Sequence, residues 1–277
     1  MKRKITFLIG ILALWFVVGC SSDDVGIRDE KNDLISKTLI SVSKENIYRT
    51  VEDLQKFRTR YSWEKQDEVA NYLFKRFQGF GIPVEFDEYD FKKKKWKNVI
   101  ATIDGKKEAG AIYMVIAHFD SISEKPEVSA PGADDNGSGT AALLEIGRIL
   151  GQAPPDATVK LAIFSNEEQG ASGSRHYARK ARERNLDIRG VLNLDVIGYN
   201  TPMANETSQT PEARGVGNGI KWRLKTMRNR MVKFLHPDGL VIVAGRTANQ
   251  GLVKEASALM QKYSRLSVKA KVDQDCG

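Results

Sequence analysis

Four groups of polar side chains with metal-binding chemistry lie at the ends of predicted strands. They are His118-Phe119-Asp120, Asp134-Asp135-Asn136, Glu167-Glu168 and Asp195. One histidine together with several carboxylates suits zinc or another divalent cation better than it suits nucleophilic catalysis. The sequence has no Gly-x-Ser-x-Gly motif and no cysteine placed to act as a nucleophile. Each group alone would be interpreted as a solvated loop or a helix cap, and only their joint placement predicts a metal site.

Apolar runs predict the strands that must bring these groups together. Residues 111–116 and 159–164 are almost continuously apolar, and residues 191–197 form a further apolar run that carries one aspartate. Such runs are typical of strands that are buried on both faces of a sheet. Apolar residues at helical spacing follow from about Ala141. Because open α/β sheets bind ligands where strands end and helices begin, we expect all four groups at one rim.

Helices and strands alternate along the rest of the chain. Ser43 and Ser62 are placed as N-caps of two helices, and residues 84–91 and 98–103 are expected to form a hairpin around the solvated lysines at 92–95. The remaining expected elements are helices at 172–184, 220–235 and 247–263, strands at 240–244 and 266–272, and a loop at 201–219. This order predicts a three-layer α/β/α sandwich around a mainly parallel, mixed sheet.

Four segments of the sequence resemble the M28 family of zinc aminopeptidases, over the region from about Asn98 to Tyr199. They are AHFDS, APGADDNGSGTAALLEIGRIL, SNEEQGASGSRHYA and LNLDVIGYN. As a set in this order they are highly specific. The resemblance implies the phosphorylase/hydrolase-like zinc peptidase fold, two zinc ions that share one carboxylate, and removal of N-terminal residues from peptides.

The resemblance also implies the metal ligands by position. His118 and Asp195 match ligands of the first zinc, Asp135 matches the ligand that bridges both ions, and Glu168 matches a ligand of the second. The family often has a cis peptide bond after the bridging residue, next to the glycines that follow it here.

Two further residues match catalytic roles in the family. Glu167 matches the general base, which takes a proton from a metal-activated water as it attacks the scissile carbonyl. Asp120 would orient the imidazole of His118, two residues before it on the same side of an extended segment. Asn136 or Ser138 is expected to cap the helix that follows, which is a structural role.

The sequence departs from the family pattern at its C-terminal end. The family's second zinc takes a histidine there, and neither His176 nor His236 stands in the matching phrase. Residues 273–276 resemble the segment that precedes this histidine. We therefore expect the chain to stop short of that ligand and of a closing strand and helix, with one complete zinc site. Two alternatives are a catalytically impaired or non-catalytic remnant of the fold and a single-zinc transferase that resembles glutaminyl cyclases.

The N-terminus predicts export and a lipid anchor. Lys2-Arg3-Lys4 precedes an apolar run from Ile5 to Val18, and the phrase Val17-Val18-Gly19-Cys20 resembles a bacterial lipobox. We expect a signal peptide at 1–19, acylation of Cys20, a polar tether at 20–40 and a peptidase domain at 41–277. The mature protein would be attached to the bacterial cell envelope, and Cys276 would be left as an unpaired cysteine.

The overall charge does not favour a nucleic-acid partner. Lysine and arginine outnumber aspartate and glutamate by 43 to 35, which gives a net charge of +8. This modest excess is spread over the whole chain, so a solvated basic surface is the favoured interpretation. The expected partners are peptide substrates and the membrane that holds the lipid anchor.

Overall fold

The computed structural model describes residues 34–198, 240–246, 250–263 and 267–273, which divide between two compact units at residue 199. Several predictions lie outside the described residues: the signal peptide, Cys20, most of the tether, the loop at 201–219, the helix at 220–235, His236 and Cys276. Among the helices of the described ranges, none combines the length and the apolar character that a membrane span needs.

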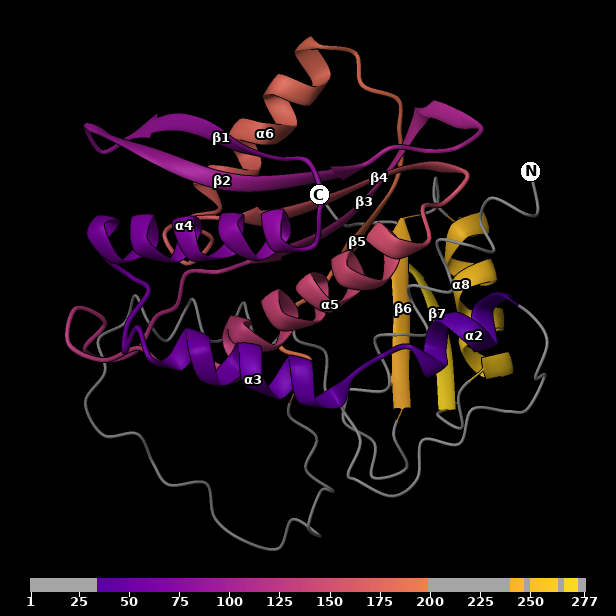
Figure 1. The fold of residues 1–277 in the computed structure, drawn as a ribbon, viewed down its shortest axis with the longest axis horizontal. Helices are drawn as coiled ribbons and strands as arrows, with labels where there is room; N and C mark the ends of the chain where they lie inside the picture. Colours follow the sequence, from indigo (N-terminus) through magenta and orange to yellow (C-terminus); the bar gives the residue numbers. More distant parts are fainter. Residues whose placement is uncertain (1–33, 199–239, 247–249, 264–266, 274–277) are drawn as a thin grey trace, which may run out of the picture. The chain divides into compact units, whose positions relative to one another are not determined.

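The first unit is built on a five-stranded mixed sheet with the order β1-β2-β4-β3-β5 (Figure 1). Its strands are β1 (Val84–Phe91), β2 (Lys94–Ile103), β3 (Glu108–His118), β4 (Ala157–Phe164) and β5 (Ile188–Asn193). Strand β2 pairs antiparallel with β1 and β4, whereas β3 pairs parallel with β4 and β5. The carboxyl ends of β3, β4 and β5 therefore meet at one edge of the sheet, as expected for a ligand-binding rim.

Helices cover both faces of this sheet, which confirms the three-layer architecture (Figure 1). They are α4 (Trp63–Gly79), α5 (Gly139–Gln152) and α6 (Ser172–Glu183), and α3 (Lys44–Gln55) packs on α5 rather than on the sheet. Consecutive residues of β4 show the two layers. Leu161 faces Gly147 of α5, whereas Ala162 lies in the apolar cluster that contains Tyr177 of α6. This alternation follows from the pleat of a strand, and both faces are apolar because both are covered.

The two predicted N-caps are confirmed. The side chain of Ser43 accepts a hydrogen bond from Asn46 N at 3.2 Å, and that of Ser62 accepts one from Lys65 N at 3.4 Å. Each cap satisfies a backbone amide that has no partner within its helix. Upstream, the end of the segment predicted as a tether is helical, since α2 spans Leu34–Ile40.

The predicted boundaries of two strands are wrong. β2 begins at Lys94, so part of the lysine run lies inside the strand. β5 ends at Asn193, before the apolar residues that prompted its extension to 197. Val196 has a φ of 51°, a left-handed conformation that cannot continue a strand. Asp195 therefore belongs to the segment that follows β5 and not to the strand itself.

The second unit, described by itself, contains two parallel strands and a helix. β6 (Leu240–Arg246) pairs with β7 (Ser267–Asp273), and α8 (Gln250–Tyr263) connects them with Val253 and Ala256 buried. A helix between two parallel strands is the usual crossover of α/β proteins. The strand, helix and strand expected in this region are thus present.

Gly173→Ala is expected to destabilise the protein because α6 begins in close contact with the strand ends. A Cβ at Gly173 would lie 2.5 Å from the carbonyl oxygen of Ser165 and would overlap Asn98 Oδ1. The expected loss is about 1–3 kcal/mol of unfolding free energy, measured by urea denaturation. Gly79→Ala is the matched control, because a Cβ there has no neighbour within 4 Å. It should be neutral or stabilising by about 0.4–1 kcal/mol, and equal losses in both variants would contradict this packing argument.

Candidate metal centre

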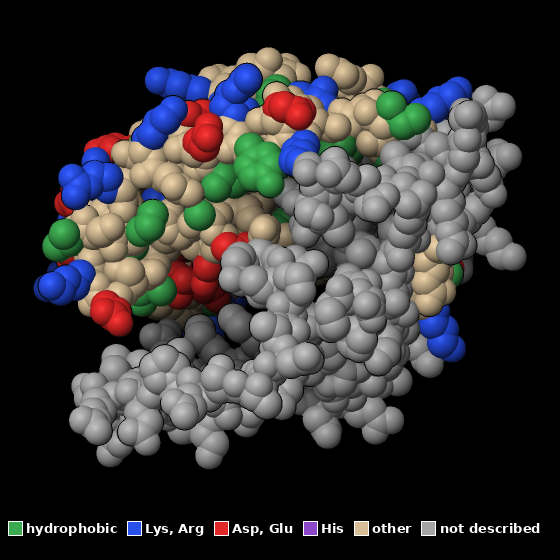
Figure 2. Space-filling view, turned by 90° about the horizontal axis from the view of Figure 1, so that it is seen from below, with side chains coloured by type: hydrophobic (Ala, Val, Ile, Leu, Met, Phe, Trp, Pro, Cys, Tyr) green, Lys and Arg blue, Asp and Glu red, His purple; other side chains and the backbone are tan. Residues whose placement is uncertain are grey.

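One ligand atom from each of three residues converges at the rim of the sheet. His118 Nε2 lies 3.2 Å from Asp135 Oδ1 and 3.4 Å from Asp195 Oδ1, and the three ligand atoms all lie within 4.8 Å of one another. The imidazole is buried, whereas the side chains of Asp135 and Asp195 are 49% and 41% exposed. Figure 2 shows acidic side chains gathered in a recess of the visible face, with lysines and arginines toward its edge. The group is therefore accessible from solvent on its carboxylate side.

Strand ends and one tight turn carry these ligands. His118 is the last residue of β3, and Asp195 follows β5, which pairs parallel with β3. Asp135 lies in the turn Ala133–Ser138 (η1), where its φ and ψ of −99° and 100° depart from helical values. The peptide bond between Asp135 and Asn136 is cis, as the sequence resemblance leads one to expect.

Hydrogen bonds join the turn that carries Asp135 to the segment that carries Asp195. They run from Asn136 Nδ2 to Leu194 O at 2.8 Å, from Ile197 N to Ser138 Oγ at 3.0 Å, and from Gly198 N to Asp134 Oδ1 at 2.7 Å. The contacts lie on both sides of Asp195, so they hold its backbone against the turn. Asn136 also caps α5, because its Oδ1 accepts from Gly139 N at 3.0 Å. Asn136 and Ser138 were the two expected alternatives for this cap, and the structure shows that Asn136 is the capping residue.

Asp120 connects the histidine to the two glutamates. Its side chain is fully buried, and Oδ1 lies 3.4 Å from His118 Nδ1. The same carboxylate accepts hydrogen bonds from the backbone amides of Glu167 at 2.9 Å and Glu168 at 3.1 Å. The main-chain carbonyl of Asp120 lies 3.2 Å from His118 Nδ1. One buried carboxylate thus contacts both the ring and the turn after β4.

Glu167 and Glu168 lie next to the three-ligand group but outside it. In the described part of the chain the group comprises His118, Asp135 and Asp195 alone. Burial raises the pKa of Glu167; the charge of His118 opposes this shift, and nearby carboxylates add to it. Burial and then the charge of Asp135 raise the pKa of Glu168 to about 8. The structure therefore places both glutamates within electrostatic reach of the group.

The electrostatics of the centre favour a cation. Burial opposes a charged imidazole, yet hydrogen bonds to Asp120, Asp135 and Asp195 raise the pKa of His118 well above its ordinary value. The surrounding carboxylates thus hold a positive charge at this position. An imidazole nitrogen and two carboxylate oxygens are suitable zinc ligands, and catalytic zinc sites have three protein ligands and one open position. The residues present therefore fit a divalent cation.

The sequence interpretation missed the residues that support the centre from behind. Asn166, with a φ of 55°, directly precedes Glu167. Its backbone amide donates to Gln66 Oε1 at 3.2 Å, and Gln66 Nε2 donates back to Asn166 Oδ1 at 3.3 Å. Asn166 Nδ2 also donates to the Tyr89 hydroxyl at 2.9 Å. Asparagine adopts the left-handed conformation more readily than most residues. Its position between a strand and an acidic pair is the one sequence signal that could have identified Asn166.

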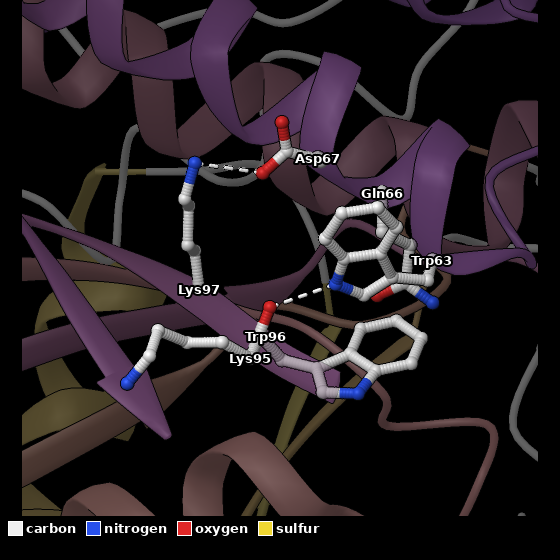
Figure 3. A pocket seen from close by; sticks show the side chains of 6 residues that line it. All are labelled: Trp63, Gln66, Asp67, Lys95, Trp96 and Lys97. Carbon is white, nitrogen blue, oxygen red and sulfur yellow. Dashed lines mark hydrogen bonds and ion pairs between the residues drawn. The ribbon is translucent and has the colours of Figure 1, made fainter. Parts of the chain in front are cut away.

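A second depression lies between α4 and the β1–β2 hairpin and shares no residue with the metal group (Figure 3). It is lined by Trp63, Gln66, Asp67, Lys95, Trp96 and Lys97. Lys97 pairs with Asp67 at 2.7 Å, and the Trp63 indole donates to Lys95 O at 2.7 Å (Figure 3). These polar groups have hydrogen-bond or ion-pair partners within the protein. The metal group is therefore the better candidate for the functional site.

Comparison with known proteins points to one family. A model of peptidase family M28 matches residues 98–237, about half of the chain. A probable zinc metalloprotease of Pyricularia oryzae is 38% identical over 115 residues, which are 40% of this chain and 23% of that protein. A probable leucine aminopeptidase of Trichophyton verrucosum is 34% identical over 179 residues, 60% of this chain and 47% of that protein. The chain thus spans less than half the length of these two curated relatives.

A solved structure shares the fold. The crystal structure of LapA from Legionella pneumophila aligns with a TM-score of 0.66 and 19% identity, over 94% of this chain and 62% of that one. This likeness supports the mixed α/β architecture.

Zn²⁺ is expected to stabilise the folded chain, because it binds the assembled group and not the unfolded chain. At a free concentration of 100 times the Kd the gain is about 2.7 kcal/mol, seen as a higher Tm after removal and re-addition of the metal. His118→Ala should abolish the increase. His176→Ala is the matched control, since that ring stacks on Tyr89 with centroids 5.3 Å apart and lies outside the group. A zinc response that persists in His118→Ala would rule out this site.

Proposed function

Because the chain belongs to peptidase family M28, we propose that it acts as a zinc-dependent aminopeptidase. The observation that carries this proposal is the convergence of His118, Asp135 and Asp195 beside the Glu167-Glu168 turn. The names of the relatives, a zinc metalloprotease and a leucine aminopeptidase, support the same chemistry. The substrate class is then peptides with a free N-terminus.

Three residues would hold one zinc ion: His118, Asp135 and Asp195. When bound, zinc polarises a scissile carbonyl and makes an attacking water more acidic. Glu168 is the candidate ligand for a second ion that shares Asp135, because the charge of Asp135 is close enough to raise the pKa of the buried Glu168 carboxyl. Asp135 would then be the bridging carboxylate, as in other two-metal hydrolases.

Glu167 is the proposed general base. Burial raises the pKa of its carboxyl, which makes the ionised form a stronger base than a solvated glutamate. Its backbone amide is fixed by the buried carboxylate of Asp120, so the side chain starts from a defined position. In this role Glu167 takes a proton from the attacking water and gives it to the leaving amine.

Asp120 is the proposed orienting residue for His118. Its carboxylate and its carbonyl both lie near Nδ1, which leaves Nε2 to face Asp135 and Asp195. A histidine ligand that is held in this way keeps the tautomer and ring orientation that metal binding requires. Asp120 also accepts from both glutamate amides, so it couples the ligand to the base.

We further propose that the protein is exported and anchored by lipid at Cys20, on the basis of the basic leader, the apolar run and the lipobox-like phrase. Cells that express the full chain and are fed labelled palmitate should label it, and Cys20→Ser should remove the label. Cys276→Ser is the matched control and should stay labelled. Labelling that survives in Cys20→Ser would contradict the anchor.

Glu167→Gln is expected to lower kcat for release of an N-terminal amino acid by about 10²–10⁴-fold, because the amide cannot take a proton. Zinc content should stay close to that of the unmodified chain, since Glu167 is not a ligand of the three-residue group. Glu64→Gln is the matched control. That carboxylate lies on α4, is 61% exposed and pairs with Lys94, so its loss should leave kcat unchanged.

The substrate panel for this assay includes peptides that begin with glutamine. Ammonia release with cyclisation would instead favour the glutaminyl-cyclase-like transferase. A chain that binds zinc, releases no amino acid and cyclises no glutamine would overturn the enzymatic function and leave a metal-binding remnant.

A further inference from the structure

One arginine side chain lies beneath the candidate metal centre, and we infer that Arg60 is a positioning residue that sets the distance between the segments carrying His118 and Asp135. This inference rests on the proposed function, because it concerns the same zinc site. It adds a residue from outside the four polar groups, in the turn between α3 and α4.

The guanidinium of Arg60 donates hydrogen bonds to carbonyl groups of two ligand-bearing segments. Nε donates to Phe119 O at 2.6 Å, and Phe119 directly follows His118. On the other side, Nη1 donates to Pro131 O at 2.5 Å and Nη2 donates to Gly132 O at 2.9 Å. The planar fork of a guanidinium holds its donors in a fixed relation. The distance from the end of β3 to the start of the turn that carries Asp135 is therefore set by one rigid group.

The turn closes tightly around this group. Gly132 has a φ of +49°, and a Cβ there would lie 2.7 Å from Arg60 Nη2 and 2.6 Å from Ser121 Cβ. It would also overlap the carbonyl oxygen of Asp135. The only side chain that fits at position 132 is a hydrogen atom, because the backbone approaches the guanidinium so closely. The turn and the arginine are thus fitted to each other.

The backbone of Arg60 adds a second connection to the same region. Arg60 N donates to Ser121 Oγ at 3.2 Å, and Ser121 N approaches Arg60 O at 3.4 Å. Ser121 Oγ in turn donates to Ala130 O at 2.6 Å. The segment after Asp120 and the segment before Asp134 are therefore both tied to the turn that carries Arg60.

The charge of Arg60 is buried but stabilised by hydrogen bonds to backbone carbonyl groups. The side chain is fully buried, and burial lowers its pKa to about 10, while the charges of Asp120 and Asp135 oppose that shift. The group stays protonated at neutral pH. A buried charge is costly unless its hydrogen-bonding capacity is satisfied, and here backbone carbonyls satisfy it.

The test compares Arg60→Lys and Arg60→Met with the unmodified 277-residue chain. Zinc affinity is measured by competition with a chelating dye, and Co²⁺ absorption spectra report the ligand geometry. Both variants should lose about 10–100-fold in zinc affinity, as is typical when an outer support of a ligand is removed. Lysine should not restore the affinity, because an ammonium keeps the charge but cannot span three carbonyls.

A matched control separates positioning from general stability. Phe77→Leu alters a fully buried residue of α4 that packs near Gly147, so it should lower the Tm of the metal-free chain without changing zinc affinity. If Arg60→Met does not fold, Ser121→Ala takes its place. It removes the hydroxyl that joins Arg60 to Ala130 and should reduce affinity in the same direction.

The two hypotheses fail in different ways. Tight zinc binding by the unmodified chain and equally tight binding by Arg60→Lys would overturn the positioning role alone. Loss of affinity in Phe77→Leu that matches its loss of Tm would also overturn it. No zinc binding by the unmodified chain would overturn the proposed function and the positioning role together.

Discussion

The crowding of acidic side chains around one buried imidazole is the constraint on which the site depends. Asp135 and Asp195 approach His118 Nε2, Asp120 approaches Nδ1, and burial with like charge raises the pKa of Glu168. Carboxylates held this close repel one another unless positive charge lies among them. Backbone amides that point to Asp120 and the guanidinium of Arg60 supply part of that charge. A cation bound by His118, Asp135 and Asp195 would supply further positive charge at the ligand atoms.

The sheet alone does not set this arrangement. Parallel pairing brings the ends of β3 and β5 to one edge, but Asp135 lies in the turn before α5 and must be positioned by other contacts. These contacts come from two different segments. The segment after β5 forms hydrogen bonds with residues 134, 136 and 138. Arg60, in the α3–α4 turn, donates to the carbonyl groups of residues 131 and 132, just before the turn that carries Asp135. Asp135 is thus located by contacts with segments distant in sequence.

This explains which features could be predicted from the sequence. Apolar runs and serine N-caps depend on local periodicity and chemistry, so the main helices and strands were predictable. The end of β5 could not be predicted, because Val196 and Ile197 are apolar although Val196 adopts a left-handed conformation. The role of Arg60 could not be predicted from the sequence either. Arg60 binds backbone carbonyls, which every residue has, and nothing in the sequence distinguishes it among 43 basic residues.

The candidate carboxylate ligands are partly exposed, whereas the residues that support them are buried, and this difference has a functional reason. Asp135 and Asp195 keep 49% and 41% of their side-chain surface exposed, whereas the side chain of Asp120 is fully buried and Arg60 likewise has no exposed surface. Exposed carboxylates allow an ion and a substrate to approach without opening the protein. Buried supports cannot exchange their hydrogen bonds with water, so they hold the ligand backbone in one geometry. The centre can therefore remain open to solvent and still be preorganised, as the proposed metal-assisted hydrolysis would require.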